Sequence, residues 1–420
     1  MSKTKAKESG LTSDSLKEAI NKKLGIRAAT SWKEAKERRE FKGFLSTGFS
    51  ILDTLICNEK NANYQGGIPF GGLTMIAGEE QSGKSLLAGH IAASVLKSGG
   101  KCVFLNREYG ADFDFWKRIG IAEDDPNMIN VEISTIEQAF QVMDAVISDV
   151  EDRRLKNEKM VIIWDSLAAT MTEDDLEKEI SQIGEKDYPR APRIINDGIK
   201  KIMSTVQKYG IALVFINQLR MKMNVGMYED KYMIPGGQGL RHFCDVIIRL
   251  HISGKQEVDG ERVATGVKVV IAKNRVAPPL RKYHMWAYFG TGFREELSYL
   301  ERLQEKGIVK KSGKTNVIEW KGEEKRFLDK NWLKMLQDSE FYKWVVRQVV
   351  DSYIINHAEE VELKNLIGKV NTDTGEILGD IDEEEIEGSA EQDQNVDKGD
   401  EGEEQKSGNS SKETGEEERF

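Results

Sequence analysis

Short apolar segments alternate with amphipathic ones through the middle of the chain, from about residue 44 to residue 296. This alternation predicts an α/β fold with a mainly parallel, twisted sheet and helices on both faces. The expected parallel strands are 73–78, 102–106, 160–165, 212–217 and 246–252. Two more apolar segments follow each other closely enough to predict an antiparallel, hairpin-linked pair, at 267–274 and 284–289. Helical spacing of apolar residues predicts a helix over 193–208.

The segments that flank this core have other patterns. Before residue 35, apolar residues recur at helical spacing and Ser15-x-x-Glu18 matches a capping box, which predicts a small N-terminal helix. A second such pair, Ser31 and Glu34, opens a highly charged stretch that is either a solvated helix or a linker. Residues 297–368 have mostly helical spacing with one expected strand at Val317–Trp320.

These patterns predict four parts. They are an N-terminal helical segment and linker (1–43), an α/β core (44–296), a small α+β C-terminal domain (297–370) and a disordered acidic tail (371–420). The tail has 19 acidic against 4 basic residues, a net of −15 in a chain whose net charge is −10, so the first 370 residues carry +5. Such a tail cannot bury enough apolar surface to fold. It either solubilises the chain or competes with a polyanion for a basic surface.

Several classes of protein are excluded by composition. No run of 18 apolar residues exists, and the basic start is followed by no apolar signal region, so we expect a cytoplasmic protein that does not span a membrane. Three widely spaced cysteines form no disulfide framework, which suits a reducing compartment. The five histidines show no metal-ligand spacing, and His90 and His251 are interpreted as ordinary residues at the edge of the core.

A phosphate-binding pattern follows the first expected strand. Residues 78–85 match GxxxxGK[ST] and open an apolar helix. In such a loop the backbone N–H groups surround the phosphates and the helix N-terminus adds positive partial charge. Lys84 would reach the β- and γ-phosphates and the Ser85 hydroxyl would bind Mg²⁺. The sequence therefore predicts an ATP site made of Gly78, Glu79, Glu80, Gln81, Ser82, Gly83, Lys84 and Ser85.

Two acids after neighbouring strands add to this site. Asp165 ends an apolar strand about 80 residues after the loop, as a second Mg²⁺ contact requires. Glu108 follows strand 102–106 and could orient the attacking water, although a solvated glutamate at a strand end fits the pattern as well. The aromatic residues that could stack on adenine, or equally belong to the core, are Phe113, Phe115 and Trp116.

A long segment after strand 212–217 is suited to single-stranded nucleic acid. Gln218 could sense the γ-phosphate. Residues 219–239 then interleave positively charged side chains with flat or flexible apolar ones. In such a segment the charges follow the phosphates of a single strand and the apolar groups pack on or between its bases. An amphipathic surface loop is the alternative. The residues concerned are Arg220, Met221, Lys222, Met223, Tyr228, Lys231, Tyr232, Gly236 and Gly237. A second candidate loop, 183–193, contains two prolines with Arg190 and Arg193.

Together, and in the order in which they follow one another along the chain, these motifs resemble those of the RecA family of recombinases, and the phage UvsX-like branch looks closest. The resemblance runs from about Leu45 to Ile308. Its segments are LSTGFSILD (45–53), the P-loop, FLNREYGAD (104–112), VIIWDSLAA (161–169), FINQLRMK (215–222), Gly236–Gly237, VKVVIAKNRVAPP (267–279) and FGTGFREELSYL (289–300). The chain departs from many relatives at Trp164, which precedes Asp165, and in its proline-bearing loop 183–193.

The resemblance implies roles that the residues alone leave open. Glu108 matches the glutamate that positions water, and Gln218 the amide that senses the γ-phosphate and orders the DNA-binding loop after it. Asp112 and Phe115 match positions at the adenine, and the loops 183–193 and 219–235 match the two DNA-contacting loops. Lys273 and Arg275 match basic residues that reach the ATP of the neighbouring subunit. The N-terminal helix matches a segment that packs on an adjacent subunit.

The expected function is a DNA-dependent ATPase in recombination, repair and recombination-dependent replication. It would form helical filaments on single-stranded DNA, pair them with homologous duplex and exchange strands, using ATP and Mg²⁺ and helped by mediator and single-strand-binding proteins. Three rivals share the P-loop core: a hexameric ring helicase, a regulatory paralogue that binds ATP without enzymatic activity, and a binding module with no DNA role.

Overall fold

The computed structural model describes residues 12–25, 29–31, 33–34, 41–58, 66–107, 113–155, 158–178, 190–222, 231–258, 260–354, 369–370 and 377–378. The chain divides into two compact units, Met1–Ile354 and Ile355–Phe420. In the second unit the described residues form one pair of short strands, β17 (Lys369–Val370) and β18 (Ile377–Leu378). The acidic segment 379–420 lies outside the described residues.

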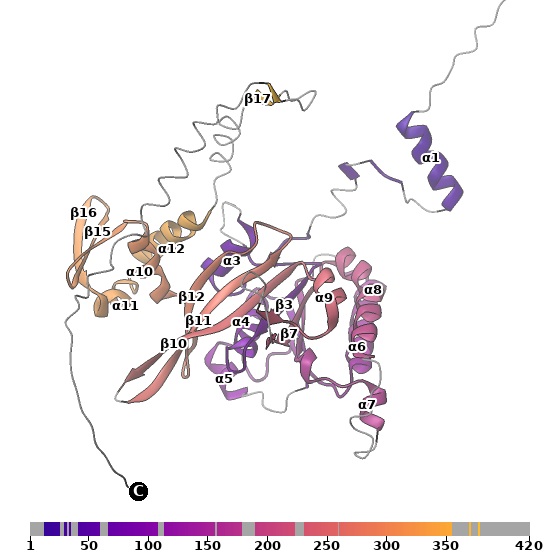
Figure 1. Cartoon of the computed structure of the whole chain (residues 1–420), viewed down its shortest axis with the longest axis horizontal. Helices are drawn as coiled ribbons and strands as arrows, with labels where there is room; N and C mark the ends of the chain where they lie inside the picture. Colours follow the sequence, from indigo (N-terminus) through magenta and orange to yellow (C-terminus); the bar gives the residue numbers. More distant parts are fainter. Residues whose placement is uncertain are drawn as a thin grey trace, which may run out of the picture. The chain divides into compact units, whose positions relative to one another are not determined.

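A nine-stranded sheet with the order β13-β12-β11-β10-β3-β7-β6-β4-β5 organises the first unit (Figure 1). The pairs from β10 to β5 are parallel and those from β10 to β13 are antiparallel. The strands are β3 (Leu73–Gly78), β4 (Lys101–Asn106), β5 (Met128–Glu132), β6 (Met160–Asp165), β7 (Ala212–Gln218), β10 (Val246–Val258), β11 (Glu261–Asn274), β12 (Lys282–Tyr288) and β13 (Gly292–Arg294).

The predicted parallel strands and the antiparallel pair are confirmed. Strands β10 and β11 extend further than predicted, because polar residues continue their pairing to Val258↔Glu261. The edge strand β5 was not predicted, since its sequence MINVE is partly exposed along its length and lacks a continuous apolar run. A two-stranded pair, β1 (Phe44–Leu45) with β2 (Ile68–Pro69), lies outside the main sheet.

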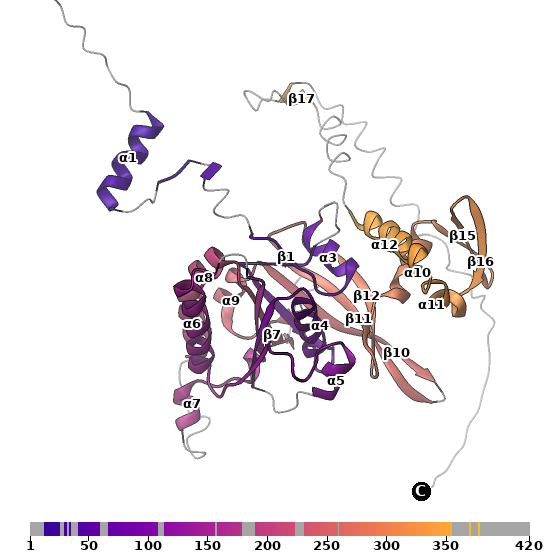
Figure 2. The ribbon, with the colours of Figure 1, turned by 180° about the vertical axis from the view of Figure 1, so that it is seen from behind.

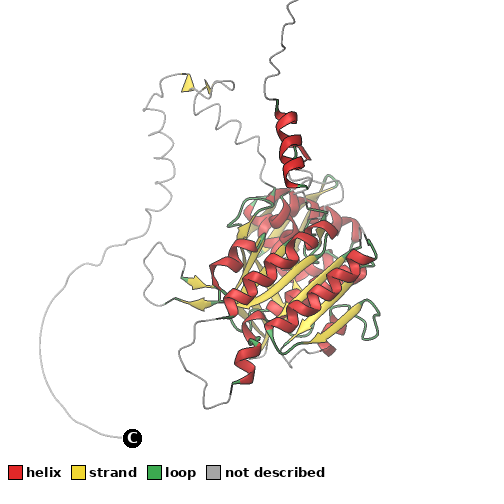
Figure 3. Cartoon of the chain, turned by 90° about the vertical axis from the view of Figure 1, so that its right-hand side faces the viewer, coloured by secondary structure: helices red, strands yellow, loops and turns green. Residues whose placement is uncertain are grey.

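Helices cover both faces of the sheet, which explains the apolar character of the parallel strands on both sides (Figures 1 and 2). Alternate residues of one strand enter different cores: Ile163 packs with the cluster of α4, and Trp164 with the cluster of α6 and α8. In Figure 3 the helices of the α6–α8 face lie in front of the strands. The helices are α3 (Ser50–Cys57), α4 (Lys84–Lys97), α5 (Phe113–Arg118), α6 (Ile136–Asp152), α7 (Glu173–Glu177), α8 (Ala191–Tyr209) and α9 (Gly237–Phe243).

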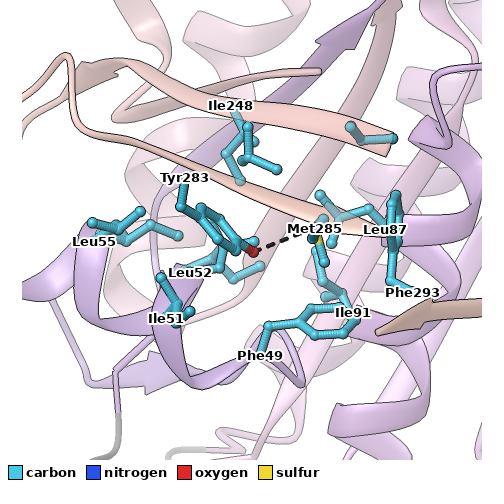
Figure 4. Packing of buried hydrophobic residues seen from close by; sticks show 14 of the residues in the cluster. Phe49, Ile51, Leu52, Leu55, Leu87, Ile91, Ile248, Tyr283, Met285 and Phe293 are labelled. Atoms are coloured by element: carbon cyan, nitrogen blue, oxygen red, sulfur yellow. Dashed lines mark hydrogen bonds between the residues drawn. The ribbon is translucent and has the colours of Figure 1, made fainter. Parts of the chain in front are cut away.

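The α4 face of the core joins elements that are far apart in the sequence. Figure 4 shows residues of α3 and α4 packed beneath the antiparallel strands, with Phe293 at one end. The Tyr283 hydroxyl is buried here and donates a hydrogen bond to the sulfur of Met285 at 3.3 Å. The predicted helix 193–208 is confirmed as α8, and its buried stripe includes Ile195, Ile199 and Val206.

After β13 the chain forms α10 (Glu296–Glu305), a three-stranded antiparallel sheet, α11 (Trp332–Met335) and α12 (Ser339–Tyr353). The strands are β14 (Val309–Ser312), β15 (Thr315–Trp320) and β16 (Glu323–Leu328). The mostly helical pattern predicted here is corrected: β15 was foreseen, but its neighbours VKKS and EEKRFL are mainly polar because most of their side chains are exposed. Helix α12 packs on α3, and Phe341 belongs to the core cluster of the large sheet.

The predicted N-terminal helix is confirmed as α1 (Ser13–Leu24), but its cap is one turn earlier than expected. Thr12, not Ser15, is the N-cap, and its side chain accepts from the Ser15 N–H. Ser31 and Glu34 form the reciprocal hydrogen bonds of a capping box, at 3.1 and 3.2 Å. Among the described residues, no helix is long and apolar enough to cross a membrane. The boundaries proposed at residues 43, 296 and 370 stay predictions.

Candidate nucleotide site and nucleic-acid interface

The loop between β3 and α4 has a path that only glycine permits at two positions. A Cβ added to Gly78 would lie 2.3 Å from the Ser82 hydroxyl oxygen. Gly83 has a φ of 85°, and a Cβ there would lie 2.6 Å from Cζ of Phe293. Both glycines thus allow the backbone to curl tightly before α4 begins at Lys84, as a phosphate-binding loop requires.

Side chains inside the loop hold this curl. The carbonyl oxygen of Glu79 accepts from the Ser82 hydroxyl and from the Lys84 ammonium group, both at 2.7 Å. The Lys84 charge therefore lies over the loop. No side chain caps the first turn of α4, and Ser85 in that turn is exposed. Glu80 and Gln81 are exposed at the loop's tip.

The parallel strands end at one edge of the sheet, and several predicted site residues meet there. Gly78 is paired in register with Gln218 on one side and with Leu250 on the other. Asp165 ends β6 and is buried. Residues at the carboxyl ends of parallel strands are the usual place for a ligand in such sheets.

The donor chemistry fits a magnesium ion. The Ser85 hydroxyl and the Asp165 carboxylate are hard oxygen ligands, and Mg²⁺ in phosphate sites is usually held by one or two protein oxygens together with phosphates and water. Among the residues that the structure describes, no group of three or more His, Cys, Asp or Glu could hold a metal on its own.

Three predicted residues of the nucleotide site cannot be placed. Glu108 and Asp112 lie outside the described residues, and the side chain of Phe115 is not described although its backbone belongs to α5. Trp116 belongs to the core: it is buried, with its ring centroid 4.7 Å from that of Phe104. The roles of Glu108 in water activation and of Asp112 and Phe115 in adenine contact stay predictions.

Asn217 has a role that the sequence did not reveal. It is fully buried, its amide nitrogen donates to the Pro235 carbonyl at 2.9 Å, and its oxygen accepts from the Gln218 N–H at 2.9 Å. The side chain therefore ties the end of β7 to residue 235, at the far end of the predicted DNA-binding segment. Gln218 itself is exposed, next to Gly78.

The segment after β7 has a hairpin stem. Strand β8 (Arg220–Met221) pairs antiparallel with β9 (Tyr232–Met233), and the Lys222 N–H donates to the Lys231 carbonyl at 2.9 Å. Arg220, Met221, Lys222, Lys231 and Met233 are exposed, Met221 by 72%. Met223 and Tyr228 lie outside the described residues.

Exposed basic and exposed apolar side chains thus occur together on this stem. Gly236 and Gly237, both with positive φ, lead from the segment's end into α9.

Comparison with known sequences decides the family. The profile of the RecA N-terminal domain matches residues 14–294. The chain belongs to the RecA family. It is 29% identical to the protein RecA of Aquifex pyrophilus over 324 residues, 76% of this chain and 83% of that protein. It is 34% identical to protein RecA of Aquifex aeolicus over 249 residues (59% and 68%), and 32% identical to that of Oleidesulfovibrio alaskensis over 252 residues (59% and 67%).

The chain is therefore a RecA-family ATPase, and ATP binding follows from the family. The predicted α/β fold with a RecA-like core is confirmed. Membership in this family also implies a part in DNA recombination and repair.

In this RecA-family chain, Lys273 and Arg275 bind the carboxyl end of α9. The Lys273 ammonium group donates to the carbonyls of Arg241 at 2.6 Å and His242 at 3.1 Å. Arg275 donates to the His242 carbonyl at 2.6 Å and to the Asp245 carboxylate at 3.2 Å. Burial, with the charge of Arg275 nearby, lowers the pKa of Lys273. Both cations therefore lie at the end of the helix that follows the predicted DNA-binding segment.

The other predicted loop leaves only its last residues in view, because 179–189 lie outside the described residues. Arg190 forms an ion pair with Asp174 of α7, and Arg193 lies 3.8 Å from Asp197 along α8. The side chain of Arg193 is 88% exposed. Exposed ion pairs of this kind contribute little to stability.

Proposed function

We propose that this protein is a DNA-dependent ATPase that polymerises on single-stranded DNA and exchanges that strand with homologous duplex. The observation that carries the proposal is the junction of the phosphate loop and the exposed β8–β9 stem. The Leu219 N–H donates to the carbonyl of Gly78 at 3.0 Å, so the DNA-binding segment begins where the phosphate loop begins. A movement of the phosphate loop would therefore also move the start of the β8–β9 stem.

The residues have these proposed roles. The backbone N–H groups of Gly78–Ser85 and the Lys84 ammonium group hold the ATP phosphates, and Ser85 with Asp165 would hold Mg²⁺, which neutralises charge on those phosphates when bound. Glu108 orients the attacking water, Gln218 senses the γ-phosphate, and Asp112 with Phe115 contacts adenine. Lys273 and Arg275 exchange the α9 carbonyls for the ATP of a neighbouring subunit.

DNA would contact both loops. Basic groups would follow the phosphates while methionine and tyrosine side chains pack on or between bases. The residues concerned are Arg190, Arg193, Arg220, Met221, Lys222, Met223, Tyr228, Lys231, Tyr232, Gly236 and Gly237. Such contacts release counterions, so binding should weaken steeply as salt rises.

Within the family we place the chain in the phage UvsX-like branch, with mediator and single-strand-binding proteins as further partners. Identities of 29–34% to bacterial RecA proteins support a position apart from those proteins. Trp164, the position at which the sequence departs from the family pattern, is fully buried, and its indole N–H donates to the Thr170 hydroxyl at 3.1 Å.

The test measures ATP hydrolysis with and without single-stranded DNA, with the same samples imaged by electron microscopy. We expect DNA to stimulate hydrolysis and helical filaments to form. Glu108→Gln should lower hydrolysis by at least about 100-fold while the filaments persist, because it removes the group that orients water. Parental hydrolysis by Glu108→Gln would contradict the assigned base. Closed hexamers that unwind duplex DNA would favour a helicase instead.

A further inference from the structure

We propose that His251 is a positioning residue that links the phosphate loop to the far strand of the DNA-binding stem. The proposal rests on the function proposed above and adds a residue to it. His251 lies in β10, one position beyond the residue that pairs with Gly78. From there it contacts Glu79 of the loop and Tyr232 of β9 at the same time.

The first contact is polar. Nδ1 of His251 lies 3.1 Å from Oε1 of Glu79, with side-chain exposures of 16% and 36%. A carboxylate only accepts hydrogen bonds, so the proton is on Nδ1. The backbone of Glu79 is held as well, since its N–H donates to the Leu250 carbonyl at 3.4 Å.

Glu79 is also hydrogen-bonded within the phosphate loop. Its carbonyl oxygen accepts from Lys84 and Ser82, two residues of the phosphate cradle. A phosphate that draws the Lys84 ammonium group away would remove a hydrogen bond from the Glu79 backbone carbonyl. A resulting movement of Glu79 would displace its carboxylate and, with it, the His251 ring.

The second contact is between rings. The His251 and Tyr232 centroids are 4.6 Å apart and their planes are inclined at 50°. Tyr232 is half-buried between the exposed Lys231 and Met233, and its strand partner is Met221. A shift of the His251 ring would therefore move a strand whose neighbouring side chains, Lys231 and Met233, are exposed to solvent.

This link is separate from the backbone bond between Leu219 and Gly78. That bond holds the near strand of the stem, β8, whereas His251 holds the far strand, β9. Both strands are thus tied to consecutive residues of the phosphate loop, Gly78 and Glu79.

The test compares the full chain with His251→Phe, which keeps the ring against Tyr232 but loses the donor, and His251→Asn, which keeps a donor but loses the ring. Glu257→Gln is the matched control: it also lies in β10, and its carboxylate pairs with Lys255 at 2.6 Å, away from the phosphate loop. The readout is the Kd for a fluorescent oligo-dT, with and without a non-hydrolysable ATP analogue. The ratio of the two values reports coupling, and a merely structural defect would weaken both.

We expect the analogue to tighten binding by the parent and by Glu257→Gln. In each His251 variant that gain should fall at least about fivefold, a typical coupling between two sites. If either variant keeps the parental gain, the link through His251 is wrong while the proposed function stands. If the parent shows no gain, the proposed function itself fails. Should the variants not fold, as judged by thermal unfolding, Tyr232→Leu takes their place with the same two outcomes.

Discussion

At the scale of single residues, Gly83 is a position of the phosphate loop that tolerates little change. Its φ of 85° disfavours any other residue, and the ring that an added Cβ would meet, Phe293, is buried against Phe49. We expect Gly83→Ala to weaken ATP binding at least about tenfold, because the loop must shift by a distance that misplaces its N–H groups. Binding is measured by titration with a fluorescent ATP analogue.

Gly99 offers a control for this prediction. It has a similar φ of 76°, but a Cβ there would meet nothing within 4 Å. Gly99→Ala should therefore cost about 1 kcal/mol of stability and leave ATP affinity unchanged. Parental ATP affinity in Gly83→Ala would show that nucleotide binding does not depend on this turn.

At the scale of elements, α3 depends on a buried carboxyl group from another part of the chain. Glu295 accepts from the N–H groups of Ser50 at 2.8 Å and Ile51 at 2.7 Å, and from the Tyr299 hydroxyl at 2.8 Å. Burial raises the pKa of Glu295 to about 8, against the lowering effect of these hydrogen bonds. The first turn of α3 thus rests on a group that titrates near neutral pH.

This pKa predicts how stability changes with pH. Above the ordinary value of 4.5 the unfolded chain has lost this proton, while the folded chain keeps it up to about pH 8. The folded state therefore binds more protons across that window, and the free energy of unfolding should fall as pH rises from 4.5 to 8, by up to about 5 kcal/mol.

Urea unfolding at pH 5 and pH 8 measures the effect. Glu295→Gln should flatten the pH dependence and lower stability at pH 5, since an amide cannot accept in the same way from both N–H groups. The exposed acid Glu319 of β15 provides the control Glu319→Gln, which should keep the parental pH dependence. An equal slope in all three proteins would show that Glu295 does not titrate in this window.

At the scale of the whole molecule, charge is divided between the acidic tail and the rest. Residues 371–420 have a net charge of −15, whereas the first 370 residues have a net charge of +5. We expect a chain that ends near residue 380 to take up duplex DNA at higher salt than the full chain, because a competing polyanion has been removed. Duplex binding is measured by fluorescence anisotropy across a salt series. Unchanged uptake would leave the tail as a solubilising segment only.

Much of the fold follows from local pattern. The phosphate loop, the parallel strands and α8 could be predicted because glycine spacing, apolar runs and helical periodicity are properties of neighbouring residues. The same reasoning failed at β5, β14 and β16, which are partly exposed and keep their place by pairing with other strands. Pairing of that kind leaves only a weak trace in the sequence.

The residues of the candidate site divide in the same way. By itself the sequence determined the chemistry that the chain carries: a phosphate cradle at Gly78–Ser85, an acid at Asp165, and a basic, apolar segment after Gln218. Only the tertiary structure decided that Asn217 ties that segment's two ends together, that Lys273 and Arg275 bind α9, and that His251 joins Glu79 to Tyr232. The reason is distance along the chain, since each of these contacts joins residues at least 18 positions apart, which only folding brings together.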